Sequence, residues 1–251
     1  MTMKIVKNLL SLFLFVTTVT AQESARDIIK KSDDLMRGKT HTGKYTMTII
    51  RPDWQRTTEF KFWSEGTDKA FILILAPAKD KGVTFLKIKK EMWNYIPKIN
   101  RDIKIPPSML LQSWMGSDFT NDDLVQESNA VTDYSHTLLG KERVAGYEAY
   151  KIELKPKPKA AVVWDKIVML IAVKNYVPLK EEYYNERGEL IRTMIFYDIK
   201  KMDGRVIPAK FEIIEEKKPG HKTVMELEDV TFNKPVKRSV FTKQNLRRAK
   251  P

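Results

Sequence analysis

The sequence contains no cysteine among its 251 residues. Disulfide bonds, thiolate metal sites and cysteine nucleophiles are therefore excluded, and the hydrophobic core alone must stabilise the folded chain. Histidine is also scarce: His41, His136 and His221 are scattered, with neither the i,i+4 nor the His-x-His spacing of a zinc site. We expect these histidines in turns or on the surface, and we predict no metal site and no cofactor.

Motifs for covalent chemistry are missing as well. The sequence has no Gly-x-Ser-x-Gly elbow and no glycine-rich phosphate loop. Ser135 and His136 are adjacent, as are Glu181 and Glu182, and neighbours in a strand point to opposite faces of a sheet. Because nothing assembles an acid, a base or a nucleophile, we predict no catalytic residue and a protein that is not an enzyme.

An apolar run near the N-terminus predicts export. Lys4 and Lys7 precede "LLSLFLFVTTV", which is too short to span a bilayer comfortably, and "VTA" before Gln22 offers small residues for cleavage. Residues 1–21 are therefore interpreted as a secretory signal peptide, with an uncleaved anchor as the alternative. No cysteine follows the run, which excludes a lipid-anchored mature N-terminus. We expect the mature protein to be soluble in the periplasm.

Positive charge predominates, with 45 Lys and Arg against 32 Asp and Glu, a net charge of +13. Such a surface suits anionic partners, which outside the cytoplasm are phospholipid or lipopolysaccharide headgroups. Nucleic acid is not an expected partner in that compartment, and no recognition motif for it is present. The alternative is that the lysines only keep strand faces and edges soluble.

Periodicity predicts one short helix followed by strands. Ser24 can cap a helix over Ala25–Arg37, which Gly38 ends. Runs such as "TTEFKFWSEG" and "KAFILILAP" then alternate, and "NERGE", "MDGR" and "KKPGHK" are hairpin turns. We predict about ten antiparallel strands in one meander and a single domain over residues 22–251. The expected fold is α+β, a strongly curved antiparallel sheet forming an incomplete β-barrel, with helices covering its concave side.

The stretch "PPSMLLQSWMGSDFTNDDL" interrupts the strands. Pro107 suits a first helical turn, Leu110 and Trp114 share a face, and Gly116 can end a helix that is apolar nearly all round. Thr120 and Asp123 then form a capping box for a second helix. The first helix is either an ordinary core helix or an adaptable apolar lid over a bound molecule, and the residues leave both interpretations open.

This stretch also carries a family resemblance. "WNYIPKINRDIKIPPSMLLQSWMGSDFTNDDL", with the later "VPLKEEYYNERGELIRTMIFYDIKKMDGRVIPAKFEI" and "FTKQNL", resembles the LolA-like outer-membrane lipoprotein-sorting superfamily, in its broad uncharacterised branch. The resemblance spans roughly Asp27 to Arg247. It implies an open barrel around an apolar cavity, and a protein that carries or senses lipids or lipoprotein acyl chains in the periplasm. In the classical carrier an arginine ties the lid shut; Arg51, Arg56 and Arg101 all fall in expected strands, so none is singled out.

Together these features predict a monomeric periplasmic carrier that sequesters acyl chains of lipids or lipoproteins for transfer towards the outer membrane. An inner-membrane transporter and an anionic membrane surface are further expected partners. The alternative is an envelope interaction or sensor protein, or an accessory subunit of a lipid-exporting pump, with the same fold. Aromatic and methionine side chains are the candidate lipid-binding residues: Phe60, Phe62, Trp93, Tyr95, Met109, Leu110, Trp114, Met115, Phe119, Met194 and Phe196.

Overall fold

The computed structural model describes residues 23–125, 129–158, 160 and 162–251. Helix α1 (Ala25–Arg37) has the predicted bounds: the Ser24 hydroxyl accepts a hydrogen bond from the Asp27 backbone N–H at 3.1 Å. Gly38 ends the helix with φ +65°, a left-handed conformation that favours glycine. The cleavage site and the segment before it lie outside the described residues.

Across the described residues, thirteen strands form one antiparallel sheet. The first six are β1 (Thr40–Ile50), β2 (Gln55–Glu65), β3 (Lys69–Ala76), β4 (Thr84–Ile88), β5 (Glu91–Ile96) and β6 (Arg101–Ile105). The others are β7 (Tyr134–Val144), β8 (Tyr147–Pro156), β9 (Lys166–Ala172), β10 (Pro178–Tyr184), β11 (Leu190–Met202), β12 (Arg205–Glu215) and β13 (Lys222–Phe232). Arg101, which was expected in a strand, begins β6, and Ser135 and His136 lie in β7.

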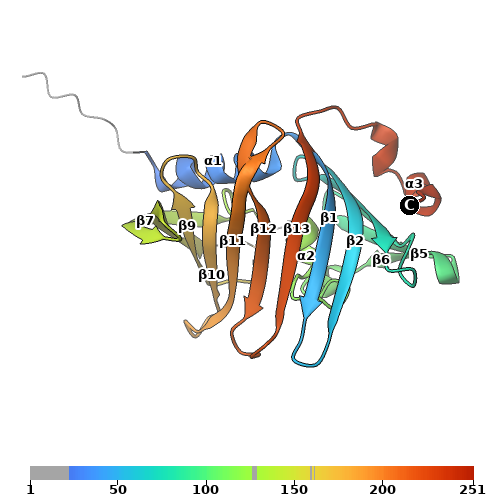
Figure 1. Cartoon of the computed structure of the whole chain (residues 1–251), viewed down its shortest axis with the longest axis horizontal. Helices are drawn as coiled ribbons and strands as arrows, with labels where there is room; N and C mark the ends of the chain where they lie inside the picture. Colours follow the sequence, from blue (N-terminus) through green and yellow to red (C-terminus); the bar gives the residue numbers. More distant parts are fainter. Residues whose placement is uncertain (1–22, 126–128, 159, 161) are drawn as a thin grey trace, which may run out of the picture.

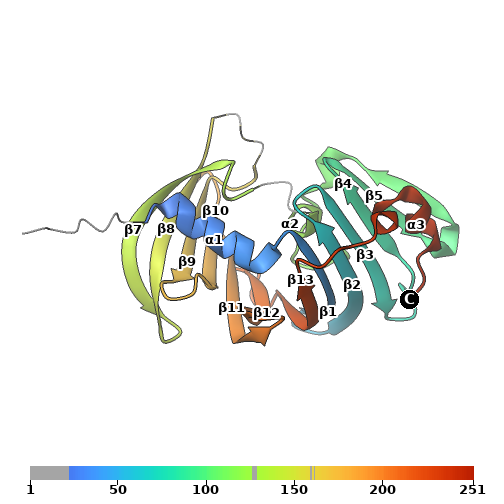
Figure 2. The ribbon, with the colours of Figure 1, turned by 90° about the horizontal axis from the view of Figure 1, so that it is seen from above.

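The sheet consists of two meanders rather than the single one we predicted. Its order is β6-β5-β4-β3-β2-β1-β13-β12-β11-β10-β9-β8-β7, so β1 pairs with β13 and joins the two halves. Both edges, β6 and β7, therefore flank the middle of the chain, and the segment between them must connect the two edges. The sheet curves into an open arc, and α1 lies within that arc (Figures 1 and 2).

The predicted helix over Pro107–Met115 is wrong. Only a 3-10 turn, η2 (Pro107–Met109), forms there. The chain then folds back on itself, with the Trp114 N–H donating to the Phe119 carbonyl oxygen at 2.7 Å. Met115 and Gly116 at the bend both have positive φ, +51° and +78°, which a right-handed helix cannot accommodate.

The second predicted helix start is confirmed. α2 (Asn121–Val125) is a short helix, and Thr120 and Asp123 form the expected capping box. The Thr120 N–H donates to Asp123 Oδ2 at 2.7 Å, and the Asp123 N–H donates to Thr120 Oγ1 at 3.1 Å.

The two faces of the sheet carry different cores. The concave face holds the large core, to which α1 contributes Ile28 and Ile29. On the opposite face, β3 to β5 are covered by the C-terminal segment, which contains η3 (Arg238–Phe241) and α3 (Lys243–Arg248). A further 3-10 turn, η1 (Pro97–Ile99), joins β5 to β6.

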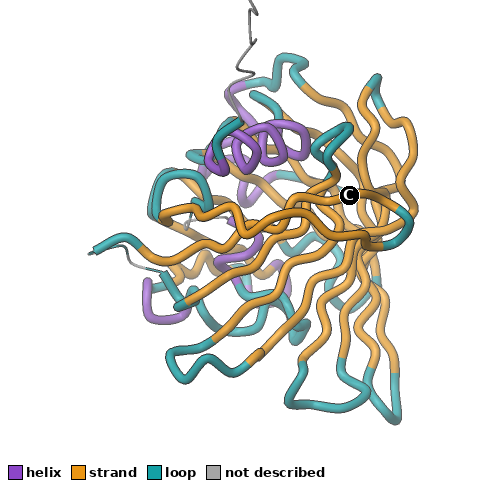
Figure 3. The backbone as a smooth tube through the Cα atoms, turned by 90° about the vertical axis from the view of Figure 1, so that its left-hand side faces the viewer, coloured by secondary structure: helices purple, strands orange, loops and turns teal. Residues whose placement is uncertain are grey.

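The predicted fold class, a curved antiparallel sheet in an unclosed barrel with helical cover inside the curve, is confirmed (Figure 3). Alternation along β1 shows how the sequence specifies it. Tyr45, Met47 and Ile49 are buried on the concave face, whereas Thr46 and Thr48 between them are only partly buried. Within the described ranges, no helix has the length and apolar character needed to cross a membrane.

Candidate functional site

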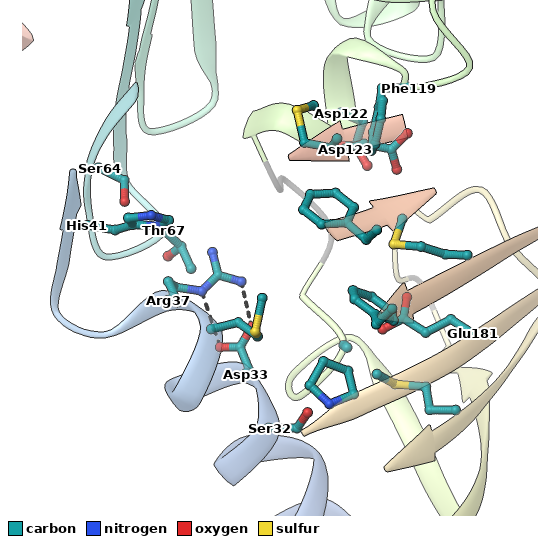
Figure 4. Close-up of a pocket in the computed structure, with 18 of the residues that line it drawn as sticks. Ser32, Asp33, Arg37, His41, Ser64, Thr67, Phe119, Asp122, Asp123 and Glu181 are labelled. Atoms are coloured by element: carbon teal, nitrogen blue, oxygen red, sulfur yellow. Dashed lines mark hydrogen bonds and ion pairs between the residues drawn. The ribbon is translucent and has the colours of Figure 1, made fainter. Parts of the chain in front are cut away.

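A cavity of about 330 Å³ lies between the concave face of the sheet and α1. Side chains from α1, from β1 to β3 and from β9 to β13 surround it, and Figure 4 shows labelled residues from several of these elements around one space. Its apolar lining is mostly aromatic and thioether: Met36, Tyr45, Phe60, Phe62, Phe119, Trp164, Met169, Met194, Phe196, Phe211 and Met225. Aromatic faces and unbranched thioethers adapt to varied apolar shapes.

Five predicted lipid-binding residues line this cavity: Phe60, Phe62, Phe119, Met194 and Phe196. They come from β2, from the segment before α2 and from β11, so the fold brings together positions far apart in the sequence. Tyr45, which was not predicted, stacks on Phe60 with ring centroids 5.3 Å apart and an angle of 6° between the planes. Strand alternation identified the inward positions on β2 and β11 correctly.

Of the predicted lipid-binding residues around the bend, some lie in the core and one lies at the surface. Trp114 is fully buried, edge-on to Phe60 at 5.4 Å and to Phe85 at 5.6 Å, but it packs behind the cavity wall and does not line it. Leu110 is also buried in the core, and Met115, at the bend, is partly buried and packs against the same core. Met109 is 40% exposed at the surface. The structure therefore assigns Trp114 to the core.

Trp93 and Tyr95 lie on the opposite face of the sheet. Trp93 packs in the outer core with Phe241 and Leu246, and the Lys243 amino group lies 4.3 Å from the centre of its ring. Met92 is the β5 residue in the inner core. The alternation predicted for β5 was right, but the aromatic face was wrongly taken as the inner one, because the C-terminal segment covers the outer face.

Arginine side chains fix the segment between β6 and β7 to the sheet. Arg51, which directly follows β1, makes two hydrogen bonds with Asp118, both at 2.9 Å, and the side chains of this pair are 10% and 5% exposed. Arg56 on β2 donates to the backbone carbonyl oxygen of Met115. Arg101, the third arginine considered from sequence, is exposed on edge strand β6.

Arg192 is a site residue that sequence reasoning missed. It is 2% exposed on β11 and donates to both carboxylate oxygens of Asp123, at 2.9 and 2.7 Å. Burial by itself would raise the pKa of Asp123, but Arg192 and the Thr120 donors outweigh it and hold that pKa below its usual value. Asp123 therefore does more than cap α2, because it also neutralises a buried guanidinium.

Glu181 is a second missed residue. It faces the cavity from β10, where its direct cross-strand neighbours are Met169 on β9 and Met194 on β11. Tyr183, next on the same face, donates a hydrogen bond to Glu181 Oε2. Burial raises the pKa of the Glu181 carboxyl, and the hydrogen bond from Tyr183 opposes that shift without reversing it.

Polar groups also lie at the end of the cavity beside α1's C-terminus. Asp33 and Arg37 form an ion pair at 2.7 Å (Figure 4). Arg205 donates to the backbone carbonyls of Asp34 and Leu35 at 2.8 and 2.7 Å and so holds the end of the helix.

His41 corrects our expectation of surface histidines. It is buried, lines the cavity, and its Nε2 lies 2.6 Å from the Tyr45 hydroxyl. Burial, reinforced by the charges of Arg205 and Arg37, lowers its pKa to about 4. Its ring is therefore neutral at neutral pH. In the part of the chain that the structure describes, no group of three His, Asp or Glu side chains is arranged to hold a metal ion.

Comparison with known proteins identifies the family. A family model described as an uncharacterised protein matches residues 66–248. The chain belongs to this family. None of the curated proteins matches it.

Solved structures confirm the fold that the sequence resemblance implied. A DUF1329 family protein from Desulfovibrio piger is 23% identical with a TM-score of 0.81, over 88% of this chain and 97% of that one. A LolA superfamily protein from Nitrosomonas europaea is 21% identical with a TM-score of 0.75, over 89% and 99%. An outer-membrane lipoprotein-sorting protein domain from Vibrio parahaemolyticus is 21% identical with a TM-score of 0.77, over 89% and 98%. This family member therefore has the LolA-like fold.

Proposed function

We propose that this protein is a periplasmic carrier that sequesters the acyl chain of a lipid or lipoprotein in its cavity, for transfer towards the outer membrane. The observation that carries the proposal is the cavity of about 330 Å³ with its aromatic and thioether lining. That volume lies at the lower end of small-molecule pockets, which measure ~300–1,000 Å³ and are mostly apolar. One structural neighbour is described as an outer-membrane lipoprotein-sorting protein domain, and this description also supports a carrier function.

The architecture around the cavity favours reversible binding of a ligand over covalent catalysis. The rigid wall is a hydrogen-bonded sheet. The cover consists of α1 and the largely irregular segment between β6 and β7, which the side chains of Arg51, Arg56 and Arg192 hold to the sheet. Regions of that kind open at lower cost than the sheet does. An acyl chain would enter by displacing cover, without any covalent step.

A membrane-facing surface belongs to the same proposal. On β6 and the turn before it, Ile99 and Ile103 are 55% and 42% exposed, and the exposed basic residues Lys98 and Arg101 lie beside them in the chain. We call these four residues the β6 surface. Exposed apolar side chains among basic ones suit an anionic membrane, where the carrier would load or unload. An inner-membrane transporter remains a predicted partner.

Titration of a fluorescent fatty-acyl probe into protein refolded from urea tests the carrier proposal. Met225 lines the cavity, so Met225→Trp should occupy space that acyl carbons need, and each excluded CH₂ costs ~0.8 kcal/mol of binding. Leu73→Trp is the matched control, because Leu73 is equally buried but lies in the outer core. We expect clear weakening by Met225→Trp alone. A wild type that does not bind the probe, or equal effects of both variants, would favour the interaction-protein alternative.

A further inference from the structure

Strand β10 carries two glutamate–tyrosine pairs, one on each face of the sheet. On the outer face, Glu182 Oε2 accepts a hydrogen bond from the Tyr184 hydroxyl at 2.8 Å, and Glu182 Oε1 accepts one from Lys180 Nζ at 2.6 Å. On the inner face, Glu181 accepts a hydrogen bond from Tyr183, and its direct cross-strand neighbours are both methionines. Among the described residues, the outer carboxylate is therefore paired with a cation, whereas the inner carboxyl has no ion pair of its own.

The lack of an ion pair at Glu181 costs free energy because of the apolar side chains around its carboxyl. Its carboxyl lies in a row between Met169 and Met194, and the next row places Tyr183 between Ile167 and Arg192. A carboxyl among thioethers is destabilising unless something hydrogen-bonds to it. Within the described residues Tyr183 is its one hydrogen-bond donor, and that bond occupies only Oε2. The other oxygen, on a side chain that lines the cavity, is available to a ligand.

Arg192 adds a second unsatisfied group at the same wall. Its two Nη atoms are taken up by Asp123, and its guanidinium lies 4.5 Å from the ring centre of Tyr183 and 4.9 Å from that of Trp164. Its Nε is buried and has no hydrogen-bond acceptor among the described residues. A buried donor without an acceptor costs free energy that a bound acceptor could recover.

The charges of the cavity decide what kind of group fits there. The described lining contains the cations Arg37, Lys69 and Arg192, and each pairs with a carboxylate: Asp33, Glu65 and Asp123, respectively. The Arg37 and Arg192 pairs are largely buried, so a phosphate or carboxylate buried beside Glu181 would find no unpaired cation among the described side chains there and would be strongly disfavoured. A hydroxyl or amide group can instead both donate and accept hydrogen bonds without carrying charge.

We propose that Glu181, with Tyr183 and Arg192, forms the polar end of the cavity and binds an uncharged hydroxyl or amide group attached to the acyl chain. The inference rests on the proposed function and narrows the ligand to neutral amphiphiles. Glu181 acts in its protonated form, and its O–H donates to the ligand oxygen. The outer pair, Glu182 with Tyr184, provides the same residue types on the same strand without access to the cavity.

Displacement of diphenylhexatriene, an apolar fluorescent probe, by a monoacylglycerol measures this recognition. We expect the monoacylglycerol to displace the probe more strongly than a fatty acid, a lysophospholipid or an alkylamine of equal chain length. Glu181→Leu should weaken monoacylglycerol binding, relative to binding of the probe itself, by roughly tenfold through loss of a hydrogen bond. Glu181→Gln, which mimics the protonated carboxyl, should restore most of it. Glu182→Leu should change the affinity for neither the monoacylglycerol nor diphenylhexatriene.

The outcomes separate this inference from the carrier proposal. If the wild type does not bind diphenylhexatriene, the cavity does not take apolar ligands and both proposals fail. If the probe binds but charged and neutral amphiphiles compete equally, the carrier proposal stands and the polar end is overturned. Equal weakening by Glu181→Gln and Glu181→Leu would also overturn it, because an ionised carboxylate would then be the binding form.

Discussion

Arg192 and Asp123, 69 positions apart in the sequence, form a two-point hydrogen-bonded ion pair with side chains 2% and 18% exposed. The pair ties the segment that links the two sheet edges to β11, while Arg51 and Asp118 tie the same segment to the end of β1. Because β1 and β11 lie on either side of β13 and β12, the two pairs anchor the cover to both halves of the sheet.

Breaking the Arg192 pair should destabilise the protein more than the loss of a helix cap does. Asp123→Ala removes the cap, worth ~0.5–2 kcal/mol, and also leaves a buried guanidinium unpaired, so we expect a total of about 3–5 kcal/mol. Urea unfolding measures the change. Asp34→Ala, which removes the exposed Asp34–Lys30 ion pair, should cost less than about 1 kcal/mol. Similar losses in both variants would contradict the role of the buried pair.

Trp114 should act as a core residue. Its side chain is fully buried against Phe60 and Phe85, so Trp114→Ala should lower the free energy of unfolding by about 3–5 kcal/mol. Trp54, 49% exposed, provides the comparison, and Trp54→Ala should stay within about 0.5 kcal/mol of the wild type. A mild effect of Trp114→Ala, together with weaker probe binding by the folded variant, would instead support the lid interpretation of this stretch.

Acid should destabilise the protein through His41. Its pKa is lowered to about 4 in the folded protein, whereas an unfolded histidine titrates near ~6.5. Between these values the unfolded chain binds more protons than the folded one, so the free energy of unfolding falls as the pH is lowered from about 6.5 towards 4. His41→Gln removes this titration and should flatten that part of the stability curve. Identical slopes in the wild type and His41→Gln would show that other groups cause the loss.

Vesicle binding should depend on the β6 surface. The double variant Lys98→Glu and Arg101→Glu should bind vesicles with anionic lipid much more weakly than the wild type, and added salt should weaken wild-type binding. Lys217→Glu with Lys218→Glu makes the same change of charge in the β12–β13 turn and should have a smaller effect. Co-sedimentation measures both. Equal binding of the wild type to neutral and anionic vesicles would instead indicate that the lysines serve only to keep the protein soluble.

Local features of the fold were predictable from the sequence, whereas distant pairings were not. The α1 bounds follow from Ser24 and Gly38, and the capping box follows from Thr120 and Asp123, because each signal lies within a few residues. The pairing of β1 with β13 depends on strands at the two ends of the sheet-forming chain, so the hairpin turns suggested one meander instead.

The site shows the same limit. Phe60 and Phe196 could be assigned to the cavity because alternation placed them on an apolar face. Trp93 could not be assigned correctly, because a C-terminal segment covers the other face of β5. Alternation places Arg192 on the same face of β11 as Met194 and Phe196, but Arg192 and Glu181 resemble ordinary charged residues of a solvated strand. The register of β10 and β11 shows that the two lie close together in the cavity wall.

Native mass spectrometry of the gently purified, exported protein tests the carrier account most directly. If the cavity holds an acyl chain, spectra should contain a lipid-bound species that collisional activation or refolding from urea converts to the bare chain. Met225→Trp should reduce the bound fraction, and Leu73→Trp should not, because only Met225 lines the cavity. A single apo mass from the wild type, under conditions that preserve the folded state, would contradict the account.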